Sequence, residues 1–170
     1  MTTSQTPGFR EAFPGIGDAA TVLDGLEALQ GSVGQHLGWG PWHEITQEQV
    51  DRFAEATWDH QWIHVRPDLA AQGPFGAPIA HGFLTLSLAS YLMAEVVEVR
   101  GAGLVVNYGA NKVRFPAPVR VGSRIRGGGE FASLEDVGGG WTQAVFRLTV
   151  EVEDGSKPAC VAETVFRFSF

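Results

Sequence analysis

A carboxylate and an imidazole stand five residues apart in the segment Trp58-Asp59-His60-Gln61-Trp62-Ile63-His64. Hydration of a carbonyl-activated double bond needs a base for the attacking water, a proton for the α-carbon and stabilisation of the enolate oxygen. Asp59 and His64 can supply the first two if they share one water. The same spacing is also typical of a loop-capping aspartate beside an ordinary histidine, so the pair alone leaves both interpretations open.

Stabilisation of the enolate oxygen, the third requirement, can come from a glycine at the start of an apolar segment. His81-Gly82 precedes the run 82–97, which is apolar nearly all round and therefore predicts a helix buried in the core. Glycine in a first helical turn allows a ligand close to the backbone, and the free N–H groups there favour an anionic oxygen. Alternatively, Gly82 only relieves crowding after His81.

A second hypothesis is that nearby side chains bind a metal ion. Asp59, His60, His64 and His81 are ligand types that zinc accepts, and His60 and His64 have helical spacing. However, Pro67 follows closely, which indicates a loop, and no cysteine is near. We therefore predict no metal and no cofactor.

Local signals place the pair after a helix. Thr46 and Gln49 match a capping box, and apolar positions then recur at helical spacing, which predicts a helix over 47–56 that ends near Trp58. Asp59 and His64 are then expected on the following loop, and the Pro/Gly-rich stretch 67–78 is expected to lack regular structure. A further short helix is expected over 21–30.

The C-terminal half reads as successive strands joined by glycine-rich turns, which predicts a mainly antiparallel sheet. The expected fold class is α+β, with a long buried central helix wrapped by a curled sheet. We expect a flexible leader over 1–20 and a single domain over 21–170. The predicted strands cover 104–108, 111–115, 124–131, 141–153 and 159–170.

Composition limits the partners. The net charge is −7, which argues against nucleic acid, since phosphate contacts need clustered Lys and Arg. No apolar run reaches the length of a membrane span, and 1–17 lacks the pattern of a secretory signal, so a cytoplasmic protein is expected. The single cysteine, Cys160, lies in an apolar strand-like run and is interpreted as a core residue.

The segment 56–64, followed by Arg66-Pro67, Ile79-Ala80-His81-Gly82 and the run 111–124, resembles the MaoC-like hydratase family of hot-dog folds. The family includes (R)-specific enoyl-CoA hydratases, and the similarity is strongest to its nodulation protein N-related branch. It covers roughly residues 25–168. This sequence departs from the common hydratase pattern Gly-Asp-x-Asn-Pro-x-His at Trp58, Gln61 and Trp62, which puts acyl-chain preference in doubt more than the reaction.

The resemblance implies a hot-dog fold and a homodimer that joins two sheets edge to edge, with acyl-thioester sites near the interface. By the same resemblance, Asp59 and His64 hold the catalytic water, with Asp59 as the base, and the Gly82 N–H polarises the thioester carbonyl. Gln61 and Ser90 are the further substrate-binding candidates.

The implied activity is reversible hydration of a trans-2-enoyl thioester, carried by CoA or an acyl carrier, to its (3R)-3-hydroxyacyl form. Two alternatives stay open. A hot-dog thioesterase would direct water at the thioester carbonyl, and a non-catalytic protein would bind the acyl thioester without turnover.

Overall fold

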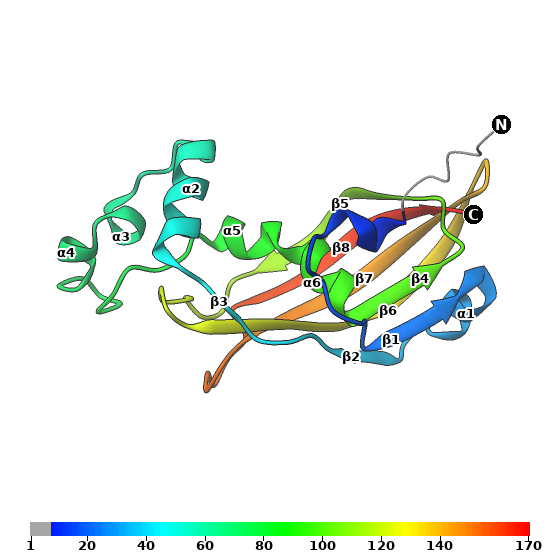
Figure 1. Ribbon diagram of the computed structural model, residues 1–170, viewed down its shortest axis with the longest axis horizontal. Helices are drawn as coiled ribbons and strands as arrows, with labels where there is room; N and C mark the ends of the chain where they lie inside the picture. Colours follow the sequence, from blue (N-terminus) through cyan, green and yellow to red (C-terminus); the bar gives the residue numbers. More distant parts are fainter. Residues whose placement is uncertain (1–7) are drawn as a thin grey trace.

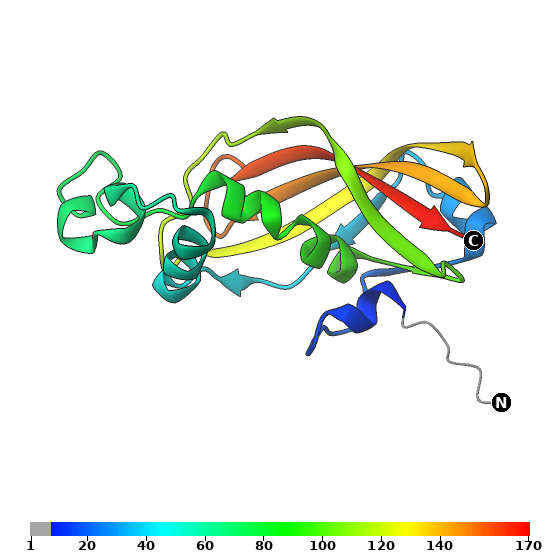
Figure 2. The same ribbon diagram turned by 90° about the horizontal axis from the view of Figure 1, so that it is seen from above.

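Two helical segments, α5 (Gly82–Ser87) and α6 (Ala89–Val96), lie across one face of an antiparallel sheet (Figures 1 and 2). The computed structural model describes residues 8–170. The predicted central helix is thus present, but Leu88 separates it into two segments. Leu88 still keeps right-handed helical angles, and Leu92 N–H donates to its carbonyl, so the two segments continue one another.

The sheet has the strand order β2-β6-β7-β8-β5, and it is not closed. Every pairing in it is antiparallel, which confirms the predicted sheet. A two-residue strand, β3 (His43–Glu44), also pairs with β6. The predicted strands 104–108 and 111–115 form one strand with bulges. The main strands are β2 (His36–Trp39), β5 (Leu104–Arg114), β6 (Arg124–Gly138), β7 (Trp141–Val152) and β8 (Cys160–Ser169).

The prediction of a helix over 21–30 was wrong in its first half. Thr21–Asp24 forms β1, which pairs in parallel with β4 (Val97–Arg100), and helix α1 begins only at Gly25 and ends at Gly31. Local periodicity did not reveal this strand because its partner lies more than seventy residues along the chain. Pairing that depends on distant residues overrides local propensity.

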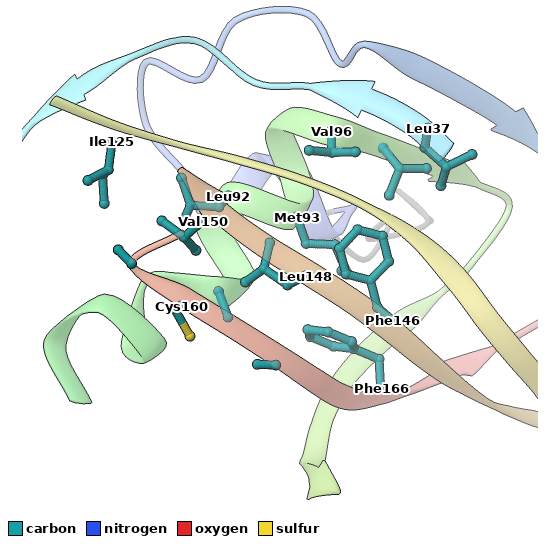
Figure 3. Close-up of a cluster of buried hydrophobic side chains, with 14 of the residues drawn as sticks. Leu37, Leu92, Met93, Val96, Ile125, Phe146, Leu148, Val150, Cys160 and Phe166 are labelled. Atoms are coloured by element: carbon teal, nitrogen blue, oxygen red, sulfur yellow. The ribbon is translucent and has the colours of Figure 1, made fainter. Parts of the chain in front are cut away.

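The core lies between the helices and the sheet. Leu92, Met93 and Val96 extend from α6 toward side chains of the central strands (Figure 3). All of these residues are at most 2% exposed. Burial of this kind supplies most of the free energy that holds an amphipathic or apolar helix on a sheet. The facing side chains are those of Phe146, Leu148, Val150 and Phe166.

Three helices project beyond one end of the sheet (Figure 1). The first is α2 (Gln47–Thr57), whose predicted capping box is present: Gln49 N–H donates to Thr46 Oγ1 at 3.2 Å, and Thr46 N–H donates to Gln49 Oε1 at 2.9 Å. Two short helices follow, α3 (Trp62–Val65) and α4 (Pro67–Ala70), so the prediction that 67–78 lacks regular structure was wrong for its first four residues. Proline suits the first position of α4, where no N–H is needed.

The N-terminal residues in the described part of the chain contact the core helix. A short 3₁₀ helix, η1 (Phe9–Ala12), carries Arg10, whose Nε–H donates to the Ala94 carbonyl at 2.8 Å. Arg10 also pairs with Glu98 at 3.2 Å. The expected leader over 1–20 falls partly outside the described residues, so the division at residue 20 stays a prediction. Within residues 8–170, no helix is both long and apolar enough to cross a membrane.

The side chain of His43 joins β3 to α6 by its contact with the buried carboxyl group of Glu95, and this contact leads to a prediction about stability. Both carboxylate oxygens of Glu95, which is 3% exposed, lie 2.8 and 2.9 Å from Nε2 of His43. We expect His43→Ala to lower the free energy of unfolding by about 2 to 3 kcal/mol, because it removes the histidine partner of a buried carboxyl group. Urea unfolding measures this. Arg52→Ala, which breaks an exposed pair with Glu48, is the control and should cost less than about 1 kcal/mol. Equal losses in the two variants would contradict the account.

Candidate active site

Asp59 lies on the loop between α2 and α3, as predicted, and its side chain is exposed. The loop begins at Trp58, whose φ of 62° lies in the left-handed region. Helices often end at a residue in this conformation, and that residue is usually glycine. This is the position at which the common hydratase pattern has glycine. The carboxylate is oriented by its own loop, because Gln61 N–H donates to Asp59 Oδ1 at 3.4 Å.

His64 lies in the short helix α3 rather than on a loop, and it is buried, with 6% of its surface exposed. Its Nδ1–H donates to the Ile79 carbonyl at 2.7 Å, because a carbonyl oxygen can only accept. The other ring nitrogen, Nε2, therefore carries a lone pair. Burial is the largest effect on the pKa of His64 and lowers it below its usual value; the hydrogen bond to the Ile79 carbonyl raises it, His81 lowers it and Asp59 raises it, each by less than burial does. The lowered pKa favours the neutral ring, whose Nε2 can accept a hydrogen bond.

The two histidines and the aspartate come together at the start of α5. The His64 and His81 rings are stacked, with centroids 3.8 Å apart. One nitrogen or oxygen atom from each of Asp59, His64 and His81 lies within 4.8 Å of the others. A single water can bridge Asp59 and His64 across such a separation. The predicted meeting of Asp59 with His64 is therefore present.

The same three side chains must be tested as a metal site. Two imidazoles that bind one ion direct their lone pairs at a common point, so both ring planes must pass through the ion. Here the rings are stacked with only 27° between their planes. Planes at this small angle, with ring centroids 3.8 Å apart, do not meet close to the nitrogens. This arrangement favours a shared water, and the absence of a metal stays a prediction.

Gly82 is the first residue of α5, directly after His81. A Cβ at this position would lie 2.9 Å from Cδ2 of Phe115, so the glycine is needed for the close approach of that ring. Phe115 also packs edge-on against the exposed Phe83. Gly82 therefore both lies in a crowded place and offers a backbone N–H at the start of a helix. The packing interpretation and the oxyanion-binding interpretation of this glycine both have structural support.

The other two predicted substrate-binding residues lie at different distances along the chain from this cluster. Gln61 is exposed and precedes α3; its carbonyl accepts the His64 N–H at 2.9 Å. Ser90 is partly buried in α6, eight residues after Gly82. At the helical rise of about 1.5 Å per residue, this places it roughly 12 Å along the helical run. Neither role is tested by these positions.

Trp58 and Trp62, which flank Asp59 in the sequence, do not form a buried aromatic wall beside Asp59 and His64. Trp58 is 87% exposed, and Trp62 is 40% exposed with its ring against Gly73. Cys160 is a core residue as interpreted from the sequence: it is fully buried, and desolvation raises the pKa of its thiol to about 11, which disfavours the nucleophilic thiolate.

His81 was considered from the sequence only as a candidate metal ligand and as the residue before Gly82, and its contacts with Asp59 and His64 were not predicted. Its Nε2–H donates to the backbone carbonyl of Asp59 at 2.9 Å, and it is 3% exposed. The signals available in the sequence were its place directly before a helix-starting glycine and its ligand type, which it shares with Asp59 and His64. Its stacking on His64, seventeen residues earlier, depends on tertiary structure: Ile79 N–H, two residues before His81, donates to the carbonyl of Ile63 in α3 at 3.0 Å.

Comparison with known proteins identifies the family of this chain. Residues 28–153 match the model of the MaoC like domain. The chain belongs to this family. It is 54% identical over 147 residues to "3-hydroxyacyl-thioester dehydratase Z" of Mycobacterium tuberculosis, covering 86% of this chain and 97% of that protein. Nodulation protein N of Rhizobium leguminosarum bv. viciae is 41% identical over 147 residues, with 85% of this chain and 91% of that protein covered.

Solved structures confirm the predicted hot-dog fold of this MaoC-like chain. The monoamine oxidase regulatory protein from Archaeoglobus superposes with a TM-score of 0.71 at 24% identity, covering 89% of this chain and 97% of the other. The (R)-hydratase from A. caviae involved in PHA biosynthesis gives a TM-score of 0.61 at 26% identity, covering 79% and 94%. The α+β layout with an open antiparallel sheet is therefore that of the family.

Proposed function

We propose that this MaoC-like protein catalyses the reversible hydration of trans-2-enoyl thioesters to (3R)-3-hydroxyacyl thioesters. The observation that carries the proposal is the cluster of Asp59, His64 and His81 at the start of α5, with polar atoms within 4.8 Å of one another. The names of the mycobacterial 3-hydroxyacyl-thioester dehydratase Z and the A. caviae (R)-hydratase support the reaction class and the stereochemistry.

In the proposed hydration, one water lies between Asp59 and His64. The Asp59 carboxylate takes one proton, the water oxygen bonds to the β-carbon, and the double-bond electrons move through the α-carbon onto the thioester oxygen. As the enolate collapses, Asp59 returns the proton to the α-carbon. His64 Nε2 accepts the second O–H in a hydrogen bond, which its fixed Nδ1–H bond to Ile79 makes possible. Dehydration is the same sequence reversed.

The Gly82 N–H is proposed to stabilise the enolate oxygen. Backbone donors placed where charge develops contribute strongly to such reactions. No cofactor enters the mechanism, since CoA or an acyl carrier belongs to the substrate. Gln61 and Ser90 are proposed to contact the substrate near the carbonyl and along the acyl chain, respectively.

Gly82→Ala tests the placement of the thioester. The new Cβ would lie 2.9 Å from the Phe115 ring, in the space beside the N–H. We expect kcat/KM to fall by about 10²-fold, because displacement of the reacting carbonyl by about 1 Å has this effect. Gly31→Ala is the control, as its Cβ would have no neighbour within 4 Å. Near-normal kcat/KM for Gly82→Ala, measured with crotonyl-CoA, would assign the glycine to packing alone.

We also propose a homodimer formed through β5, the outer strand of the sheet. Nearly all of its eleven residues are exposed, including Leu104, Val106 and Tyr108. A long edge strand with unpaired backbone groups is a template for pairing with another chain. Two structural neighbours are named complexes of two different proteins, HadBC and ChsH1-ChsH2 of Mycobacterium tuberculosis. Light scattering distinguishes a dimer from a monomer. Location in the cytoplasm stays a prediction.

Loss of enoyl absorbance with crotonyl-CoA and a longer trans-2-enoyl-CoA tests the proposed reaction. The product is assigned with a stereospecific 3-hydroxyacyl dehydrogenase, and free thiol is monitored in parallel. The proposal predicts loss of absorbance, a (3R) product and no thiol release. Thiol release would indicate a thioesterase instead. A failure to turn over either substrate, together with measurable binding, would indicate an acyl-thioester-binding protein.

A further inference from the structure

His81 contacts both groups proposed to handle the water. Its ring stacks on His64 with centroids 3.8 Å apart, and its Nε2–H donates to the Asp59 carbonyl at 2.9 Å. On another side, the ring of Phe53 lies with its centroid 5.0 Å away. His81 is also the residue that precedes Gly82, and its own carbonyl accepts the first helical hydrogen bond of α5, from Thr85 N–H. One side chain thus connects three separate segments.

The hydrogen bond to Asp59 determines where the His81 proton lies. A carbonyl oxygen accepts only, so the proton must lie on Nε2 and Nδ1 carries a lone pair in the neutral ring. Within residues 8–170, Nδ1 of His81 is the one buried side-chain polar atom that has no hydrogen-bond partner. Burial of an unpartnered acceptor is unfavourable. A position that only needed a packed ring would therefore be better served by phenylalanine.

We propose that His81 is the positioning residue of this site, holding the Asp59 loop by its Nε2–H and the His64 ring by stacking, next to Gly82. The proposal rests on the proposed function, since it names what fixes the base, the imidazole and the oxyanion donor relative to one another. The backbone bond matters because Asp59 is on an exposed loop with few other restraints. Release of that loop moves the carboxylate away from the water that His64 shares.

The two nitrogens of His81 can be tested separately by amide side chains. In His81→Gln, the amide N–H can reach the place of Nε2, which makes the bond to Asp59. In His81→Asn, the amide reaches only the place of Nδ1, which makes none, and His81→Phe keeps the ring but has no donor. A packing role predicts that phenylalanine is the best replacement. A positioning role through Nε2 predicts that glutamine is.

The expected result is a fall in kcat of about 10²-fold for His81→Phe and His81→Asn, with KM changed little, because misplaced groups affect the reaction more than binding. His81→Gln should recover most of that kcat. His60→Phe changes the exposed histidine beside Asp59 and should leave kcat unchanged. Crotonyl-CoA hydration gives kcat and KM, and thermal unfolding shows that each variant is folded. A His81→Phe variant with wild-type kcat would overturn the proposal.

Nitrogen NMR of the histidine rings tests the same proposal without turnover. We expect His81 to carry its proton on Nε2 and His64 on Nδ1, and the His64 signals to shift in His81→Phe and His81→Asn but return toward wild type in His81→Gln. His81 protonated on Nδ1, or His64 signals unchanged in all three variants, would overturn it. If the wild-type protein turns over no enoyl thioester, the proposed function fails and the NMR result alone decides the role of His81.

Discussion

Asp59→Asn is expected to lower kcat for enoyl-thioester hydration by about 10²-fold or more, the usual contribution of a general base. Asparagine keeps the size of the side chain and its acceptor oxygen, so the bond from Gln61 N–H can persist. What is lost is the capacity to take a proton from water and return it to the α-carbon. Because Asp59 is exposed, the substitution should leave the free energy of unfolding nearly unchanged.

The matched control for this variant is Asp68→Asn. Asp68 is another exposed carboxylate near the site end of the molecule, and it pairs with Arg66 at 2.8 Å. Its removal changes the net charge equally and should not alter kcat. The assay is the loss of crotonyl-CoA absorbance at saturating substrate, followed by urea unfolding of each variant. Near-normal turnover by Asp59→Asn would remove Asp59 from the mechanism.

His64→Ala is expected to be comparably damaging. It removes the buried Nε2 acceptor and breaks the bond to the Ile79 carbonyl, so the water loses one of its two partners. We expect kcat to fall by about 10²-fold or more. His60→Ala, which removes an exposed histidine only four residues earlier, is the control and should retain full activity. Full recovery of His64→Ala by added zinc would instead indicate a metal site.

The dependence of the wild-type kcat on pH is a second test of the proposed role of His64 as a neutral hydrogen-bond acceptor. Its pKa is lowered, chiefly by burial, so the neutral ring persists below the ordinary histidine value of 6.5. The reaction needs this neutral form, and kcat should therefore stay high as the pH falls through 6.5 and decline only at lower pH. A decline centred above 6.5 would show that His64 is not the acceptor, or that its ring is charged in the working enzyme.

Much of the fold could be predicted because its signals are local. The capping pair Thr46 and Gln49 begins α2 as expected, and the alternating pattern of residues 141–153 corresponds to β7. The strand Thr21–Asp24 was mistaken for helix because its pairing with β4 is set by distant residues. The short helix containing His64 was also missed, since four residues carry too little periodicity to identify a helix.

The candidate site was predicted in part. The types and order of Asp59, His64 and Gly82 indicated the chemistry, and the structure brings the first two together beside α5. The exposure of Trp58 and the stacking of His81 on His64 depend on tertiary packing, and the spacing of residues in the sequence does not predict such packing. For the same reason, the closeness of the Phe115 ring to Gly82 could not be predicted.

Hydration of crotonyl-CoA in water labelled with heavy oxygen is the measurement that tests the central claim most directly. The account predicts one labelled oxygen in the product, on the β-carbon, with the thioester intact and with incorporation that Asp59→Asn suppresses. Mass spectrometry of the intact acyl-CoA and of its free acid distinguishes the positions. Label in a free carboxylate, accompanied by released CoA, would contradict the account, as would labelling of the β-carbon at an equal rate in Asp59→Asn.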